Sequence, residues 1–444
     1  MKNISKMNLQ TERKAWLFMM KKEDILYQNY LQILKEELVP AMGCTEPIAI
    51  AYCAAKARDV LGNYPDRVTI EVSGNIVKNV KSVVVPNTDG RKGIETSAAI
   101  GIAGGDSSKA LQVIASVTDK QKEAMVAFLQ NVEISVLPLE TEEQLDILIT
   151  EYAGEHYAKV RIAGFHTNIV LIEKDDEILY QSGEVTATNV TLTDRSLLDM
   201  EHIYEFAMNA DLTDMSEILD RQINCNMAIA EEGMRNNYGA NVGSVLLHAY
   251  GNHVQNRAKA MAAAGSDARM SGCEMPVIIN SGSGNQGMTA SIPVIVYARE
   301  LEVSKEQLYR ALILSNLITI HQKTGIGRMS AYCGAISAGC GAGCGIAYLL
   351  GGDYQTIIHT LVNSVAIVSG IVCDGAKPSC AAKIEAAVDA GILGYYMYKE
   401  GQEFKGGDGI VSKGVENTIH NISRLGKIGM KETDKEIIRI MTNC

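Results

Sequence analysis

"RVTIEV", residues Arg67–Val72, alternates strictly between polar and apolar side chains, and it puts Val68, Ile70 and Val72 on one face. Alternation with a period of two is typical of a half-buried β-strand. The sequence before Pro65 has a helical period instead. This short segment therefore marks the point where the chain changes from helices to strands.

Further strand candidates follow, and a helical pattern over residues 110–129 interrupts them. They are "KSVVVP" (81–86), "VEISVL" (132–137), "AKVRIA" (158–163), "NIVLIE" (168–173) and "ILYQ" (178–181). Short strands mixed with one helix favour a small α+β domain. We expect this domain to span residues 65–193.

Helical patterns flank this region on both sides. The first ends at Pro40, and Pro47 opens a second helix that Gly62 ends. From about Leu197 the helical period returns and continues to the end of the chain. The predicted fold class is mixed α and β, mainly α. A large helical domain comprises residues 24–64 and 194–444, the smaller α+β domain of residues 65–193 is inserted into it, and residues 1–23 are a predicted flexible leader.

The composition of the chain narrows the classes of function. Of 444 residues, 47% are hydrophobic and 21% are charged, which is typical of a globular protein with a sizeable core. The net charge of −11, with both signs interspersed, argues against non-specific binding to nucleic acid or to an anionic membrane. The apolar runs are interrupted and too short for a membrane span or a signal peptide. We therefore expect a cytoplasmic protein.

Ten cysteines in such a chain are more readily ligands, nucleophiles or small core residues than a disulfide framework. In "CDGAKPSC" (373–380), Cys373 is predicted to end a helix, and Cys380 to begin the next. The loop amides and the helix N-terminus would favour thiolates. With Cys333 as a third thiol, two interpretations stay open: a three-cysteine metal site, or three cysteines buried as small apolar residues.

The spacing of these three cysteines fits none of the common zinc or ferredoxin patterns. If three thiolates hold a four-iron cluster, one iron stays open and can act as a Lewis acid. Cys340 and Cys344 lie four residues apart in a Gly- and Ala-rich helix, where close helix packing is the favoured interpretation. Cys53, Cys225 and Cys273 are predicted to be ordinary core residues.

"GSGNQG" (282–287) matches the dinucleotide-binding pattern, but the sequence after it is helical and offers no second strand. A nest of backbone N–H groups and polar side chains that holds a carboxylate is the better interpretation, with a tight polar turn as the alternative. The side chains concerned are Ser281, Ser283, Asn285 and Gln286.

Two other polar stretches hold candidate substrate-binding residues. Arg269 suits a carboxylate, although its pairing with Asp267 within a turn is also a common structural arrangement. His166 and Asn168 lie between two strand candidates, where a lone histidine is more often structural than catalytic.

Five motifs together resemble the L-cysteine desulfidases, which are distant relatives of the iron–sulfur L-serine dehydratases. They are "MGCTEP" (42–47), "GFHTNIV" (164–170), "SDARMSG" (266–272), "NSGSGNQG" (280–287) and "CDGAKPSC" (373–380). The resemblance covers the chain from about Asp24 to its end. It implies a [4Fe–4S] cluster on Cys333, Cys373 and Cys380, and Cys44 as the base that removes the substrate α-proton.

The resemblance also implies a small amino-acid substrate, with assembly into a homo-oligomer left open. L-Cysteine would lose sulfide and give pyruvate and ammonia without pyridoxal phosphate. Thr45 and Glu46 would orient Cys44 or the substrate ammonium, although Glu46 is equally a charge at a helix N-terminus. Dehydration of L-serine by the same chemistry is the alternative reaction, and a non-catalytic iron–sulfur or redox sensor is the alternative of another class.

The chain ends in Cys444. By analogy with the serine dehydratases, this thiol is a candidate tail ligand for the open iron. A surface thiol on a frayed terminus is the alternative.

Overall fold

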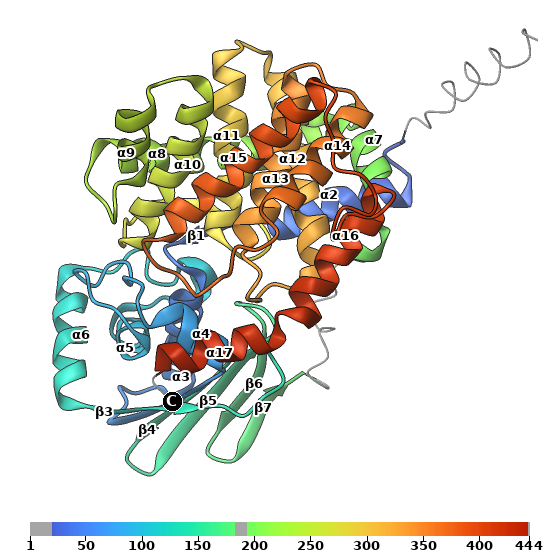
Figure 1. Ribbon diagram of the computed structural model, residues 1–444. Helices are drawn as coiled ribbons and strands as arrows, with labels where there is room; N and C mark the ends of the chain where they lie inside the picture. Colours follow the sequence, from blue (N-terminus) through green and yellow to red (C-terminus); the bar gives the residue numbers. More distant parts are fainter. Residues whose placement is uncertain (1–19, 183–192, 443–444) are drawn as a thin grey trace, which may run out of the picture.

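A computed structural model describes residues 20–182 and 193–442 (Figure 1). It confirms the predicted fold class, which is mixed α and β, mainly helical, with one six-stranded sheet region. None of the described helices is long and apolar enough to cross a membrane. The predicted leader lies almost wholly outside the described residues, and Cys444 lies outside them as well.

The sheet has the strand order β3-β2-β4-β5-β6-β7. β2 and β3 are parallel, and every other neighbouring pair is antiparallel. The strands are β2 (Arg67–Val72), β3 (Glu133–Pro138), β4 (Asp146–Ala153), β5 (His156–Ala163), β6 (Ile169–Lys174) and β7 (Glu177–Gln181). As the alternation predicts, Val68, Ile70 and Val72 are fully buried. β4 was not predicted from the sequence, because its residues are buried on both faces and do not alternate.

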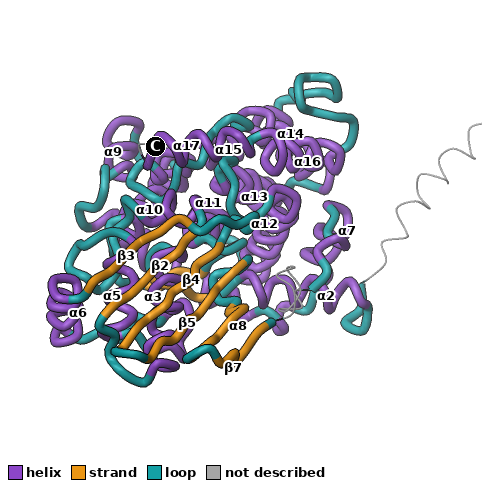
Figure 2. Tube along the Cα trace, turned by 90° about the horizontal axis from the view of Figure 1, so that it is seen from below, coloured by secondary structure: helices purple, strands orange, loops and turns teal. Residues whose placement is uncertain are grey.

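Helices lie on one side of this sheet, and Figure 2 shows the strands in front of them when the molecule is seen from below. They are α3 (Thr45–Leu61), α4 (Gly74–Val80), α5 (Ile94–Gly104) and α6 (Asp119–Asn131). α3 packs against β4, β5 and α5. It ends at Gly62, as predicted, because that glycine takes a left-handed φ of 81°. It begins two residues before Pro47, since Cys44 takes the extended N-cap conformation.

Two local predictions between the strands were wrong. Residues 81–86 form a turn rather than a strand, and only Val84 makes an isolated bridge, to Lys92. The helix expected over 110–129 is broken at Ala110, whose φ is 45°. α6 starts only at Asp119, where Thr118 and Gln121 form a capping box.

The rest of the described chain is a body of packed helices. These are α2 (Ile25–Glu37), α7 (Met200–Asn209), α8 (Ser216–Arg235), α9 (Val242–Tyr250), α10 (Val254–Met270), α11 (Gly284–Glu300), α12 (Lys305–Ile326), α13 (Gly334–Leu349), α14 (Tyr354–Ile367), α15 (Cys380–Lys399) and α16 (Val415–Arg424). A short antiparallel pair, β1 (Pro40–Met42) and β8 (Pro276–Ile278), joins the start of the chain to this body.

Small residues let α13 and α15 approach closely. A Cβ atom on Gly343 would lie 2.6 Å from the Gly391 carbonyl oxygen. Cys340 and Cys344 are fully buried on α13, as the helix-packing interpretation of that motif expects. This packing sets the relative position of the two helices that begin at Cys333 and Cys380.

The last described helix, α17 (Lys431–Thr442), returns from the helical body to α4 beside the sheet (Figure 1). Lys78 of α4 forms an ion pair with Asp434, and both residues are buried. Lys81 Nζ donates to the Met441 carbonyl oxygen at 2.5 Å. The domain boundaries at residues 65 and 193 stay predictions.

Candidate active site

Four of the predicted site cysteines line one cavity. Cys44, Cys333, Cys373 and Cys380 all face a space of about 760 Å³, open mouth included, between α3, α4, α11, α13 and α15. The chain brings them together from distant parts of the sequence, and none of the described cysteines forms a disulfide.

Three of these thiols lie at helix N-termini. Cys44 is the N-cap of α3, Cys333 is the N-cap of α13, and Cys380 is the first residue of α15. The prediction that Cys373 ends a helix was wrong, because α14 stops at Ile367. Cys373 instead lies in the following loop, where its N–H donates to the Ala331 carbonyl oxygen at 2.6 Å.

The three predicted ligands differ in their electrostatic surroundings. Hydrogen bonding to Cys373, together with burial, raises the pKa of Cys333. The same hydrogen bond lowers the pKa of Cys373 despite burial, and the charge of Lys78 lowers it further. Burial raises the pKa of Cys380. Cys373 is therefore the member of the set that ionises first.

Cys333, Cys373 and Cys380 are ligands of the kind that an iron–sulfur cluster takes, because cysteine thiolates hold such clusters. No group of three or more His, Cys, Asp or Glu side chains within residues 20–182 and 193–442 is arranged to hold one metal ion. A four-iron cluster takes one thiolate on each of three irons, so its ligands need not meet at one point. Lys78 and Lys323 also line the cavity, and both are cations able to balance several thiolates.

Cys44 lies in a hydrogen-bonded group of its own. Its Sγ donates to Glu46 Oε2 at 3.0 Å, and Asn79 Nδ2 donates to Glu46 Oε1 at 3.0 Å. His166 Nε2 is 3.9 Å from the same Oε1. Burial opposes ionisation of Glu46, but His166 and the Cys44 thiol outweigh it and lower the pKa of Glu46 to about 2. Thr45 Oγ1 donates to the Gly282 carbonyl oxygen at 3.0 Å.

Cys44 is the N-cap of α3, a position that would favour a thiolate, but its buried surroundings oppose ionisation. Burial raises the pKa of Cys44 well above its ordinary value, and the negative charge of Glu46 raises it further. Arg269 has the opposite effect but does not outweigh them. Cys44 is thus a thiol that donates a hydrogen bond to a carboxylate.

Polar side chains from α10 and α11 line the other side of the cavity. Arg269, Ser283, Asn285 and Gln286 all face it. Arg269 Nη1 donates to Asn285 Oδ1 at 3.1 Å, while Arg269 Nε and Gln286 Oε1 have no hydrogen-bond partner in the described part of the chain. Buried polar atoms of this kind are expected where a polar ligand binds.

The other predicted residues have different surroundings. Asp267 and Arg269 belong to α10 and not to a turn, and Asp267 accepts hydrogen bonds from the N–H groups of Ala240 and Val242. Asn168 does not line the cavity, and its Nδ2 donates to the Ala163 carbonyl oxygen at 2.9 Å. Ser281 faces a separate hollow.

Four further polar residues line the cavity and were not predicted from the sequence: Lys78, Asn79, Lys323 and Arg328. Lys78 and Asn79 precede the residues assigned to a strand, and Lys323 follows an uninterrupted helical pattern without any motif. Burial lowers the pKa of Lys323 to about 8. Only the spatial convergence of α4 and α12 identifies these residues.

The fold and the site define a mainly helical protein with one cavity lined by four cysteines from distant parts of the chain. A family model described as serine dehydratase alpha chain matches residues 108–439, and the chain belongs to that family. Membership suggests an amino-acid dehydratase or lyase type of activity, in a family that in general depends on iron–sulfur clusters.

Relatives of similar length are known from several bacteria. A UPF0597 protein of Desulfitobacterium hafniense is 65% identical over 424 residues, which are 96% of this chain and 99% of the relative. A UPF0597 protein of Lachnoclostridium phytofermentans is 52% identical over 94% of this chain and 100% of its own length. One from Treponema denticola is 46% identical over 94% of this chain and 98% of its own length.

Proposed function

We propose that the protein is an iron–sulfur-dependent lyase that removes sulfide from L-cysteine and gives pyruvate, ammonia and sulfide. The observation that carries this proposal is the separation of thiols within one cavity. Cys333, Cys373 and Cys380 influence one another's ionisation, whereas the Cys44 thiol donates a hydrogen bond to Glu46. Family membership supports the lyase class but leaves the substrate open.

Cys333, Cys373 and Cys380 would hold the cluster. When bound by three thiolates, a [4Fe–4S] cluster supplies an open iron that makes the substrate sulfur a better leaving group by Lewis acidity. Lys78 and Lys323 would balance the negative charge of the thiolates in this buried space.

The residues of the opposite wall would bind and orient the substrate. Arg269 and Asn285 suit the carboxylate, because a guanidinium matches its two oxygens. Glu46 suits the ammonium group. After burial, the negative charge of Glu46 is the second cause of the raised pKa of Cys44. A substrate ammonium group beside Glu46 would cancel that charge.

The Cys44 thiol would then release its proton to water and act as the general base. It would take the proton from the substrate Cα, and sulfide would leave from Cβ. The resulting aminoacrylate tautomerises and reacts with water to give pyruvate and ammonia.

The test is anaerobic purification followed by iron and sulfide analysis of single cysteine variants. Cys333→Ala, Cys373→Ala and Cys380→Ala should lose the cluster. Cys44→Ala should keep it and lose turnover. Cys225→Ala, which changes a half-buried thiol remote from the cavity, is the matched control. Full activity of the Cys44 variant would refute the base assignment.

L-Serine dehydration is the second candidate, and the description of the matching family favours it. The two reactions differ only in the leaving group, so the same residues would serve both. Release of sulfide from L-cysteine, compared with pyruvate formation from L-serine by the same preparation, decides between them.

A further inference from the structure

Two buried polar atoms of opposite kind belong to residues of the cavity wall and have no partner. Arg269 Nε is a hydrogen-bond donor and Gln286 Oε1 is an acceptor, and neither is hydrogen-bonded within the described part of the chain. The Arg269 residue is 2% exposed and the Gln286 residue is 5% exposed. Unsatisfied polar groups are costly in such a buried place, and a ligand that pairs with both atoms would remove that cost.

Close backbone contacts hold both side chains against the protein. A Cβ atom on Gly284 would collide with the Arg269 guanidinium, and one on Gly334 would lie 2.5 Å from Gln286 Cδ. The Gln286 amide therefore packs directly on the backbone at the start of α13. Gln286 also follows Asn285 in the first turn of α11, and Asn285 Oδ1 accepts from Arg269 Nη1 at 3.1 Å. The unpaired donor and the unpaired acceptor are thus held on the same wall of the cavity.

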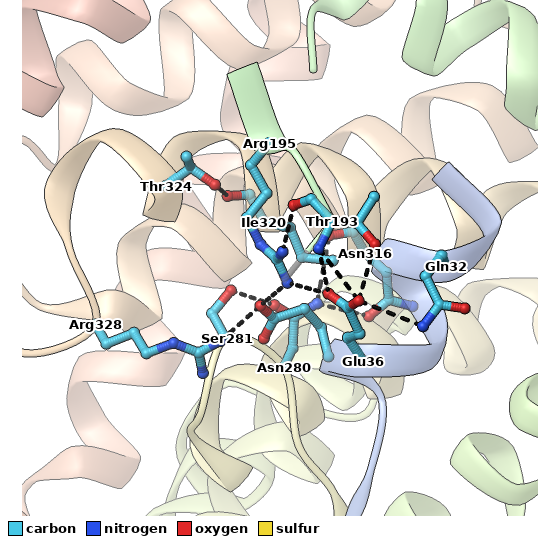
Figure 3. Close-up of polar contacts among 11 residues, drawn as sticks. Gln32, Glu36, Thr193, Arg195, Asn280, Ser281, Asn316, Ile320, Thr324 and Arg328 are labelled. Atoms are coloured by element: carbon cyan, nitrogen blue, oxygen red, sulfur yellow. Dashed lines mark hydrogen bonds and ion pairs between the residues drawn. The ribbon is translucent and has the colours of Figure 1, made fainter. Parts of the chain in front are cut away.

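Two other charged residues of the cavity already have hydrogen-bond partners. Arg328 Nη2 donates to Glu37 Oε1 at 2.7 Å, beside the polar group that Figure 3 shows. Both oxygens of Glu46 accept hydrogen bonds, Oε2 from Cys44 and Oε1 from Asn79. Glu46 therefore offers a ligand chiefly its negative charge, whereas the unpaired amide oxygen offers an acceptor that no described residue uses.

An α-amino acid fits the unpaired donor and acceptor together. Its carboxylate supplies acceptors for the guanidinium, and its ammonium group supplies three N–H donors, one of which suits the amide oxygen. A simple carboxylic acid or a keto acid has acceptors only, so it would leave the amide oxygen unsatisfied. The pair of atoms therefore suits an amino-acid substrate better than a keto-acid product of the same length.

We propose that Gln286 is a specificity-determining residue whose side-chain oxygen accepts a hydrogen bond from the substrate α-ammonium group. This inference rests on the proposed function, which places an amino acid in the cavity. It gives this side chain a different role from the carboxylate nest that the sequence suggested. Arg269 holds the carboxylate, Glu46 supplies the charge opposite the ammonium group, and Gln286 fixes the direction of its N–H bonds.

The binding of two ligands of the same length tests this role. L-Alanine has the ammonium group, propionate lacks it, and neither carries a leaving group, so binding is measured without turnover. The full-length, anaerobically reconstituted protein is titrated with each ligand by isothermal titration calorimetry. The wild type should bind L-alanine more tightly than propionate. Gln286→Met should reduce this preference about tenfold to a hundredfold, as expected for a lost hydrogen bond to a charged group.

Two further variants make the comparison specific. Gln286→Glu keeps an acceptor oxygen and should retain the preference for L-alanine. Gln222→Met changes a buried glutamine outside the cavity, and it should retain the preference as well. Gln286→Leu replaces the methionine variant if that variant does not fold, and iron content is measured for each protein.

An unchanged preference for L-alanine in Gln286→Met would overturn the proposal, and so would a wild type that does not prefer L-alanine. An equal loss of affinity for both ligands would also overturn it, because Gln286 would then contact the carboxylate. Sulfide release from L-cysteine and pyruvate formation from L-serine are assayed separately. A wild type with neither activity refutes the proposed function, whereas an active enzyme whose Gln286→Met variant keeps the preference refutes this inference alone.

Discussion

At the residue scale, the environment of Cys44 decides what this thiol can do. Cys44 and Glu46 share a hydrogen bond in a buried space, and the carboxylate opposes ionisation of the thiol. Its position next to a helix N-terminus was predictable from "MGCTEP", because Pro47 indicates a helix start. The effect of Glu46 on the pKa of this thiol was not predictable, because it depends on the burial of the thiol beside the carboxylate.

Glu46→Gln should lower kcat about a hundredfold or more, because the variant loses the carboxylate that would neutralise the substrate ammonium and orient the Cys44 thiol. The cluster should remain, since Glu46 contacts Cys44 and not the three ligands. Steady-state turnover and iron content are the measurements. Glu95→Gln, a first-turn glutamate of α5, is the control. Wild-type turnover in Glu46→Gln would show that Glu46 is only a helix-terminal charge.

Glu151 on β4 gives a prediction about pH and stability. The residue is fully buried, and both carboxylate oxygens lack a hydrogen-bond partner in the described chain. Burial raises the pKa of Glu151 well above 4.5, although Arg58 acts in the opposite direction. The folded state therefore binds this proton more tightly than the unfolded state. Its contribution to stability is complete below the unfolded pKa and is lost as pH rises through the folded pKa.

Glu151→Gln should remove this dependence, because the neutral amide resembles the protonated acid. The variant should then be more stable than the wild type at pH 8. The difference in the free energy of unfolding should be about 1.4 kcal/mol for each unit by which folding raises the pKa of Glu151, as far as that group is ionised at pH 8. Thermal unfolding between pH 5 and pH 8 measures it, with exposed Glu133→Gln as control. Parallel pH profiles for wild type and Glu151→Gln would contradict the prediction.

At the element scale, the packing of α13 against α15 positions two of the predicted ligands. Cys333 precedes α13 and Cys380 begins α15, and the glycines between the helices fix their separation. The small-residue pattern "CGAISAGCGAGCG" indicated close packing correctly, but it could not indicate the partner helix. The partner helix is α15, and the close approach of Gly343 to Gly391 in the structure identifies it.

Gly343→Ala should destabilise the protein by about 1–3 kcal/mol, the usual cost of overpacking. The added Cβ would lie within 2.7 Å of the Gly391 backbone, so the helices must separate. We also expect lower iron content after anaerobic reconstitution, because the separation displaces Cys333 from Cys380. Gly370→Ala is the control, since a Cβ there meets nothing within 4 Å. Equal melting temperatures of the two variants would be evidence against a packing role.

The other elements likewise divide into those that a sequence pattern predicted and those that depend on tertiary contacts. β2, β3 and β5 were predicted because polar and apolar side chains alternate along them, and β6 because it is a short apolar run rich in β-branched residues. α4 was missed because "NIVKNV" is short and rich in residues that favour strands. Tertiary contacts stabilise this helix, since Asp434 pairs with Lys78, and Gly375 of the cysteine loop packs against the Lys78 backbone.

At the scale of the whole molecule, α4 connects three distant parts of the chain. Asn79 reaches Glu46 at the start of α3, Gly375 of the cysteine loop lies on its backbone, and α17 supplies Asp434. No pattern in the sequence links these segments. The juxtaposition makes the C-terminal helix a structural support of the catalytic cavity, because Lys78 lines that cavity.

Asp434→Asn should therefore weaken both the fold and the site. The substitution leaves the Lys78 ammonium buried without its counter-charge, and the loss of one partner from a buried ion pair costs about 3–5 kcal/mol. We expect a lower melting temperature and faster loss of iron after reconstitution. Lys435→Gln, which removes an exposed ion pair on the same helix, should change neither.

The double variant Lys78→Met/Asp434→Leu separates the buried charge from the docking of the helix. It removes both charges and keeps the apolar contact of Ile438 with Gly74. Its melting temperature should return to near the wild-type value, because an apolar pair replaces a buried ion pair at little cost. Its iron content should stay low only if the Lys78 charge itself balances the thiolates. A double variant as unstable as Asp434→Asn would refute the buried-charge explanation.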